Sequence, residues 1–429
     1  MGDPLVRAGQ FAQGYRQVIL IGIALLLPRL GVERHDIGAW EQMQYLGYLL
    51  GFAWVTGLGQ AYLARIRKLD PHEAKALTNS LLQLSLLFAC GCLLVVWFLE
   101  TPFLRLTQGD INPVLPGWGY YMLFLLTHWP ALLYEQILLA KKKARQLILF
   151  SIISNSALGL AILLPLWLGW GWHQAIPYLL GVSFLKGGLM INPKVWQLGS
   201  NNGKFFRTLL QDSLPFIGYA AMGAIIVSFD PWFVNYWYGG DEDQFAIYRY
   251  GTRELPLLVA VTNGIGQTVL PQLGQDRAAG LKQLKSSSLR LMHLFFPLAL
   301  VLLLTSPWWW TAVFTNTFAE SLPLFQVFVF IGVSRMFFPI VVLMATGHSR
   351  ELLGIGILEF FLNAFLSLWW VKDYGLEGIV WATVIAYTID KLVAAAYLYW
   401  REGIRLQEYC SLPWLAGYTA LLTLAYFSL

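Results

Sequence analysis

Long apolar segments separated by short polar stretches recur along the whole chain. Each segment has about twenty residues, which is long enough for an α-helix to cross the hydrocarbon core of a bilayer. The pattern predicts an all-α polytopic membrane protein. The predicted spans cover residues 11–30, 38–64, 76–100, 114–140, 146–168, 174–192, 209–236, 244–270, 287–306, 321–346, 352–371, 376–400 and 411–428.

The composition agrees with this class. Of the 429 residues, 57% are hydrophobic and only 12% are charged, whereas soluble domains carry about 25% charged residues. No segment between the predicted spans is long enough to form a soluble domain. The formal net charge of +5 does not indicate a nucleic-acid partner, because the basic residues are concentrated in alternate loops.

The two sets of loops differ in charge. Under the positive-inside rule, the loops rich in lysine and arginine lie in the cytoplasm, and this places the N-terminus there as well. The basic loops cover residues 65–75, 141–145, 194–207, 277–290 and 401–405, and the opposite loops carry Asp36, Asp110, Asp241, Glu242, Asp243 and Glu320.

An internal repeat with an offset of 205 residues indicates two similar halves. The matching pairs are Ala140 and Ala345, Arg145 and Arg350, and Lys186 and Lys391. Each half then holds six spans in the same orientation, related by an axis along the membrane normal. We therefore predict an N-lobe (1–198), a cytoplasmic linker (199–208), a C-lobe (209–402) and an extra C-terminal helix (403–429). Two like-oriented lobes with charges between them favour a transporter over a channel or a receptor.

Several short runs resemble the polysaccharide-export flippases of the multidrug/oligosaccharidyl-lipid/polysaccharide (MOP) exporter superfamily. The central run is Ser213, Leu214, Pro215, Asp230, Trp232, Phe233, Gly239, Tyr248, Arg253, Leu255, Pro256, Leu270 and Pro271. The early run is Leu30, Gly31, Gly38, Gly57, Leu58 and Gly59, and the late run is Asn363, Gly375, Gly378, Ala382 and Thr383. The resemblance covers nearly the whole chain.

This resemblance implies a V-shaped pair of six-helix lobes around a cavity that opens alternately to each side. It also implies that an undecaprenyl-pyrophosphate-linked oligosaccharide moves from the inner to the outer leaflet of a bacterial inner membrane. We expect a monomer surrounded by membrane lipid, with glycan polymerase machinery as a further partner. The thirteenth span departs from the twelve-helix minimum, and its role is open.

A polar stripe along the predicted helix 244–270 gives the main candidate site. Its members are Arg249, Arg253, Asn263 and Gln267. They recur every three or four residues, so on one helix they share a face. Charge in an apolar span should face a watery interior, and a guanidinium pair suits a diphosphate. The alternative is a structural ion pair, for example between Arg253 and Glu254.

Other ionisable residues lie inside predicted spans. Arg16 and Arg335 are further candidates for the pyrophosphate, although Arg16 could instead extend to the interface. Pairing of Lys391 with Asp390 is favoured over substrate contact. In the first lobe, Glu41, His128 and Glu135 could relay protons or line the cavity, with satisfied polar pairs as the favoured interpretation. Of these, Glu41 and His128 are included among the cavity candidates.

A second group of residues offers oxygen ligands for a cation. Glu359 and Asn363 lie four apart on one helix face, and Asp230 and Thr383 could add further oxygens. The resemblance adds that some relatives bind Na⁺ between these helices. The alternative is that Asp230 neutralises an arginine and Asn363 bonds to backbone. We expect no cofactor, with Na⁺ or H⁺ as a coupling ion.

No motif for catalysis is present: the sequence lacks H-E-x-x-H, G-x-S-x-G and a Walker loop. The alternatives to a flippase are a multidrug or cation antiporter of the same superfamily and a membrane-embedded polysaccharide polymerase or ligase. The excess of arginine and lysine over acids favours an anionic cargo. The short outer loops near 101–113 and 307–320 disfavour the enzyme, since such enzymes build their active sites on a large external loop.

Overall fold

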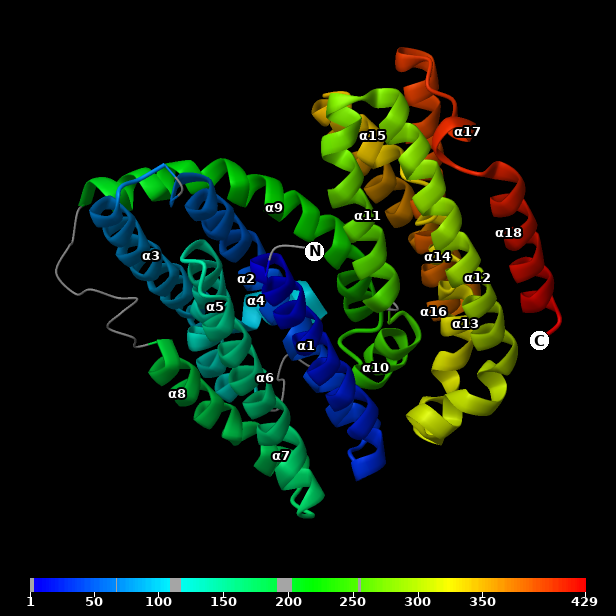
Figure 1. Ribbon diagram of the computed structural model, residues 1–429. Helices are drawn as coiled ribbons and strands as arrows, with labels where there is room; N and C mark the ends of the chain where they lie inside the picture. Colours follow the sequence, from blue (N-terminus) through cyan, green and yellow to red (C-terminus); the bar gives the residue numbers. More distant parts are fainter. Residues whose placement is uncertain (1–3, 67, 109–116, 191–202, 254–255) are drawn as a thin grey trace. The chain divides into compact units, whose positions relative to one another are not determined.

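The computed structural model describes residues 4–66, 68–108, 117–190, 203–253 and 256–429 (Figure 1). These residues form α-helices and short 3-10 turns, and there is no strand among them. The chain forms two compact units, Met1–Ala246 and Ile247–Leu429. The expectation of an all-α chain is confirmed.

The first unit contains nine helices in its described part and the start of a tenth. They are α1 (Pro4–Leu26), α2 (Arg34–Ile66), α3 (Pro71–Phe98), α4 (Glu100–Gln108), α5 (Trp118–Ala140), α6 (Ala144–Trp167), α7 (Trp172–Ala175), α8 (Leu179–Met190), α9 (Gly203–Trp237) and α10 (Glu242–Gly251). The helix pairs α2–α9, α1–α6 and α5–α8 pack extensively. Residues 199–202 of the predicted linker lie outside the described residues, and residues 203–208 begin α9. The predicted lobe boundary stays a prediction.

The second unit continues from α10. Its helices are α11 (Pro256–Gln275), α12 (Arg277–Phe314), α13 (Leu322–Phe328), α14 (Ile331–Ser334), α15 (Pro339–Ala345), α16 (Ser349–Glu402), α17 (Leu406–Tyr409) and α18 (Leu412–Phe427). The pairs α11–α12, α12–α18 and α15–α16 pack against one another. The expected extra C-terminal helix is α18, and it lies along α12.

Eight helical segments among the described residues are long and apolar enough to cross a membrane. Their surfaces are rich in exposed apolar side chains, including Trp97, Trp167 and Trp400. Exposed apolar surface of this extent is typical of helices that face lipid. The remaining predicted spans coincide with α2, with α7 and α8, with α10 and α11, and with α18. The chain is thus a multi-pass membrane protein.

One long helix of the second unit contains a chain reversal. Gly375, inside α16, has φ 55° and ψ −134°, a conformation open mainly to glycine. A Cβ atom added at Gly378 would lie 2.6 Å from the carbonyl oxygen of Trp370. Residues eight apart would be far from each other in a straight helix. The two predicted spans 352–371 and 376–400 are therefore the two legs of α16.

The predicted continuous helix over 244–270 is wrong. Helix α10 ends at Gly251, and α11 begins only at Pro256. Proline lacks an N–H donor and disfavours helical geometry in the residue before it, so it starts a new helix at this position. The stripe that links Arg249 and Arg253 to α11 is consequently interrupted, because Arg253 lies after the end of α10.

Candidate functional site

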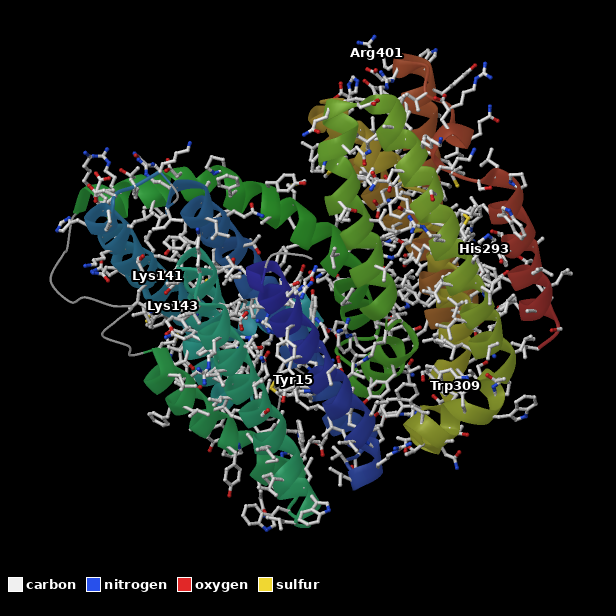
Figure 2. The ribbon with its side chains drawn as sticks, viewed as in Figure 1. Tyr15, Lys141, Lys143, His293, Trp309 and Arg401 are labelled. Carbon is white, nitrogen blue, oxygen red and sulfur yellow. The ribbon has the colours of Figure 1, made fainter. Side chains whose placement is uncertain are left out.

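A partly buried ion pair joins two helices of the first unit. Arg16 of α1 donates to a carboxylate oxygen of Glu135 on α5, and the two side chains are 24% and 12% exposed. The adjacent Tyr15 (Figure 2) shares a hydrogen bond of 2.6 Å with Ser156 of α6. These contacts fix α1 against both α5 and α6. Glu135 is thus paired with Arg16 of another helix, a partner that the sequence analysis did not give it.

A second buried pair involves the candidate His128. The Lys186 ammonium of α8 lies 2.7 Å from His128 Nδ1 on α5, and 4.8 Å from the centre of the Phe124 ring. Because an ammonium only donates, Nδ1 accepts and the neutral imidazole carries its proton on Nε2. The same ammonium gains from the aromatic face below it. Sequence reasoning missed this pairing, since it depends on the packing of α5 against α8.

The two pairs form one cluster. Glu135 and His128 lie seven residues apart on α5, about two turns along one face of the helix. The cluster therefore holds two cationic groups, Arg16 and Lys186, with Glu135 as the carboxylate paired with one of them. Glu41, the other acid proposed for this lobe, is buried in α2 and lies near Tyr121 of α5. An apolar bundle that retains such a cluster offers a contact for an anion.

The second unit brings two other candidate arginines together. Arg253 and Arg335 both line a small cavity of about 20 Å³, whose other walls are mainly aromatic and aliphatic. The Arg253 guanidinium lies 5.3 Å from the centre of the Tyr250 ring, within the range of a cation–π contact. Arg249 lies in the last turn of α10. The side chains of Asn263 and Gln267 lie outside the described part of the structure.

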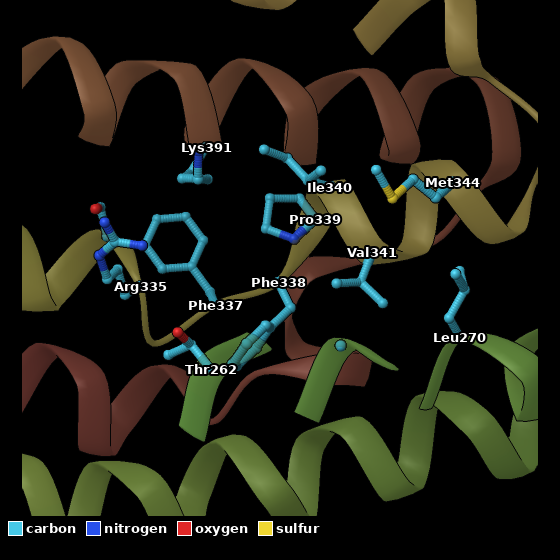
Figure 3. A pocket seen from close by; sticks show the side chains of 12 residues that line it. Thr262, Leu270, Arg335, Phe337, Phe338, Pro339, Ile340, Val341, Met344 and Lys391 are labelled. Atoms are coloured by element: carbon cyan, nitrogen blue, oxygen red, sulfur yellow. The ribbon is translucent and has the colours of Figure 1, made fainter. Parts of the chain in front are cut away.

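A larger cavity of about 340 Å³ lies beside the first one, and Arg335 lines both. Its walls come from α11, from the segment between α14 and α15, from α15, and from the second leg of α16 (Figure 3). Lys391 contributes a second cationic side chain and is paired with the neighbouring Asp390, as the sequence suggested. Sequence reasoning missed Thr262 and Ser334, which also line this cavity.

The proposed cation ligands are divided between the two units. Asp230 is buried in α9, in the first unit, whereas Glu359, Asn363 and Thr383 lie on α16 in the second. The Ser367 hydroxyl lies 3.4 Å from the Asn363 amide oxygen, and the Thr383 hydroxyl donates to the Ile379 carbonyl over 3.0 Å. Within the described residues, no group of three or more histidine, cysteine, aspartate or glutamate side chains lies close enough together to hold a metal ion. The cation site stays a prediction.

Comparison with known proteins finds solved structures that are similar to this one. No family model matches the sequence, and no curated protein matches it. Over 99% of this chain, and 93% of the other, the structure is similar to the lipid II flippase MurJ in an inward closed conformation, with 14% identity and a TM-score of 0.75. A mutant of the Vibrio cholerae MATE transporter VcmN matches with 17% identity and a TM-score of 0.60, over 94% of this chain and 99% of that one.

A third match is a MOP-superfamily transporter from Pyrococcus furiosus, with 15% identity and a TM-score of 0.60. It covers 94% of this chain and 96% of the other. The chain has the fold of the MOP-superfamily transporters. The resemblance drawn from the residue pattern is thus confirmed at the level of the fold. In this chain each of the two units places cationic side chains in segments that are otherwise apolar.

Proposed function

We propose that this MOP-fold chain flips a polyprenyl-pyrophosphate-linked oligosaccharide from the cytoplasmic to the outer leaflet by alternating access. One observation carries the proposal: the described part of each unit places arginine and lysine side chains inside apolar helical bundles. Burying a cation in a membrane is costly, so such residues usually serve a substrate or an ion. A pyrophosphate suits guanidinium groups, which bind phosphate oxygens through bidentate charge-assisted hydrogen bonds.

The fold supports the same proposal. The MurJ structure, which matches over almost the whole chain, is that of a flippase for lipid II. We propose residence in a bacterial inner membrane with the N-terminus in the cytoplasm, since the basic loops then obey the positive-inside rule. In this scheme Arg16, Arg249, Arg253 and Arg335 contact the head group while the polyprenyl tail stays in lipid.

A translocation assay tests the proposal. The full chain is reconstituted in liposomes with a fluorescent lipid-pyrophosphoryl sugar, and flipping is followed by the accessibility of the sugar. We expect the double variant Arg249→Ala, Arg253→Ala to lose translocation while it keeps its fold. Arg401→Ala, which removes an exposed arginine near the end of α16, serves as the control. Normal flipping by the double variant would contradict the assignment of these arginines.

A multidrug antiporter is the second candidate, because the matching structures include MATE and other MOP-superfamily transporters. A cationic drug in the larger cavity would lie near Arg335 and Lys391, and the repulsion between like charges would weaken its binding. Ethidium efflux from the same liposomes separates the two functions. Efflux without sugar-lipid flipping would replace the flippase by the antiporter.

The proposed coupling ion is Na⁺ or H⁺. Glu359 is the acid of the predicted oxygen ligands in the second unit. If Na⁺ binds there, Na⁺ should raise the unfolding temperature of the full chain, and Glu359→Gln should abolish that rise. Asp373→Asn, which changes an exposed acid of the same helix, is the control. An undiminished rise in Glu359→Gln would remove this site.

A further inference from the structure

A turn of three lysines joins α5 to α6 in the first unit. Lys141, Lys142 and Lys143 are the whole connection between the two helices. Lys142 has φ 54°, in the left-handed region that glycine usually occupies. The Lys142 N–H donates to the Leu139 carbonyl over 3.0 Å. The Lys143 N–H donates to the Leu138 carbonyl over 2.9 Å. These two bonds form the Schellman motif that ends many helices, in which the left-handed position favours glycine over lysine.

The second unit contains the same turn with a glycine at this position. The offset of 205 residues between the two halves of the sequence relates Lys142 to Gly347, which has φ 84°. The Gly347 N–H donates to the Met344 carbonyl over 3.3 Å, and the His348 N–H donates to the Leu343 carbonyl over 3.1 Å. The first unit therefore holds a lysine in a conformation that costs it free energy. A residue under such strain is a candidate for a function.

The two turns differ in the acids that face them. In the second unit, carboxylate oxygens of Glu402 and Glu351 lie 2.9 and 3.6 Å from the two ring nitrogens of His348. The residues offset from these acids by 205 are glutamines, Gln197 and Gln146. Gln197 lies outside the described residues, and Gln146 is exposed in the first turn of α6. The second unit thus supplies carboxylates to its turn, whereas the first unit carries neutral amides at both positions.

The turn of the first unit is correspondingly rich in positive charge. Lys143 stands at the position of the histidine, and the exposed Arg145 follows it in the first turn of α6. Burial lowers the pKa of the neighbouring Lys141 (Figure 2), and the charges of Lys143 and of Lys75 on α3 lower it further. In the part of the chain that the structure describes, no acid forms an ion pair with Lys142, Lys143 or Arg145. We call these three residues the basic turn.

We propose that the basic turn is a docking surface for an acidic segment of a partner protein. Carboxylates of that segment take the place that Glu351 and Glu402 take in the second unit. This internal precedent favours a protein over a lipid head group, because it shows helix-borne carboxylates on the same turn. Exposed ion pairs each contribute little, so several act together. Under the predicted topology the partner lies in the cytoplasm. The inference goes beyond the proposed function and does not depend on the cargo.

Binding of fluorescein-labelled octaglutamate to the full chain in phosphatidylcholine nanodiscs tests the inference. We expect octaglutamate to bind and octaglutamine not to bind. The triple variant Lys142→Gln, Lys143→Gln, Arg145→Gln should weaken octaglutamate binding on the order of tenfold, because three exposed ion pairs are lost. The matched control should bind nearly as the unaltered chain does. It removes three exposed cations of the second unit: Lys282→Gln, Arg290→Gln and Arg401→Gln.

A single added acid provides a second test, in which every cation stays in place. Gln146→Glu puts a carboxylate three residues after Lys143, which is the spacing of Glu351 after His348 in the second unit. The new carboxylate should weaken octaglutamate binding about two- to fivefold, because it competes for the same charges. It should also raise the unfolding temperature, since an acid in the first turn of a helix is favourable. Gln283→Glu in α12 is the control and should leave binding unchanged.

Three results would overturn the inference. Unchanged octaglutamate binding in the triple variant is the first, and if that variant also retains less phosphatidylglycerol during purification, the basic turn contacts lipid head groups instead. Equal losses in the triple variant and its control would mean that any exposed cation serves. Unchanged binding in Gln146→Glu is the third. Thermal unfolding shows whether each variant has folded, and Gln146→Glu decides the matter if the triple variant does not fold.

Discussion

The His348 imidazole Nε2 lies 2.9 Å from a carboxylate oxygen of Glu402, and this contact joins the loop before α16 to the far end of the same helix. Arg277, at the start of α12, reaches the second oxygen of Glu402 over 3.1 Å. Tyr397 lies 3.2 Å from Glu351, which faces the other ring nitrogen of His348. The cluster therefore ties the start of α12 to both ends of α16.

This cluster predicts a pH-dependent stability. The hydrogen bond with Glu402 raises the pKa of His348 above its usual value near 6.5. A raised histidine pKa contributes stability that is fully present below the ordinary value and is lost as pH rises through the folded-state value. The unfolding temperature of the full chain should therefore fall as pH rises from about 6 to 8. His348→Gln should reduce that dependence; an identical pH profile in the variant would contradict the prediction.

The Arg16–Glu135 pair predicts non-additive losses of stability. Removing one partner leaves a partly buried charge uncompensated, and because both side chains keep some exposure we expect Arg16→Gln or Glu135→Gln to cost about 1–3 kcal/mol. The double variant should cost less than the sum of the two single changes. Unfolding in mixed detergent micelles measures all three. Additive losses would show that the two side chains do not stabilise each other.

The close packing around Gly38 predicts that a larger residue at this position destabilises the fold. A Cβ atom at Gly38 of α2 would lie 1.9 Å from the Glu242 carbonyl oxygen, so Gly38→Ala must push α2 away from the start of α10. Overpacking of this kind costs about 1–3 kcal/mol. Gly22→Ala in α1 is the matched control, since nothing lies within 4 Å of its added Cβ. It should be neutral or slightly stabilising. Equal unfolding temperatures for the two variants would be incompatible with this close approach.

Lys141 predicts a selectively reactive amine at the end of α5 (Figure 2). Burial, together with the charges of Lys143 and Lys75, lowers the pKa of Lys141 to about 8. A large share of this amine is then neutral and nucleophilic at pH 8. Labelling with an N-hydroxysuccinimide ester, mapped by mass spectrometry, should modify Lys141 early. Lys143→Gln should raise the pKa of Lys141 and slow its labelling; an unaffected rate would exclude the neighbouring charge as a cause.

The sequence predicted the helices well because apolar length alone defines a membrane span. The reversal at Gly375 and the pairing of Lys391 with Asp390 were also accessible, since each depends on residues near one another in the chain. One prediction from the local sequence, the continuous helix over 244–270, was wrong. The three- and four-residue spacing from Arg249 onward indicated one helix, but Pro256 outweighs the spacing and begins a new helix.

Contacts between distant segments could not be predicted. The Lys186–His128 bond joins residues that lie 58 apart, on helices whose packing the apolar pattern does not define. The larger cavity likewise draws its walls from three separate segments of the second unit. One signal was present but unused: Pro339, in the middle of a predicted span, indicates the break that brings Arg335 to the cavity.

The reversal at Gly375 bears on how the chain enters the bilayer during synthesis. Both legs of α16 are apolar, and the turn between them carries Lys372 and Asp373, two adjacent charges of opposite sign. A helical hairpin with so small a polar tip exposes little to translocate, so the legs are able to insert together as one unit. A side chain at Gly375 would strain the turn at φ 55° and so disfavour the hairpin in which the two legs insert together.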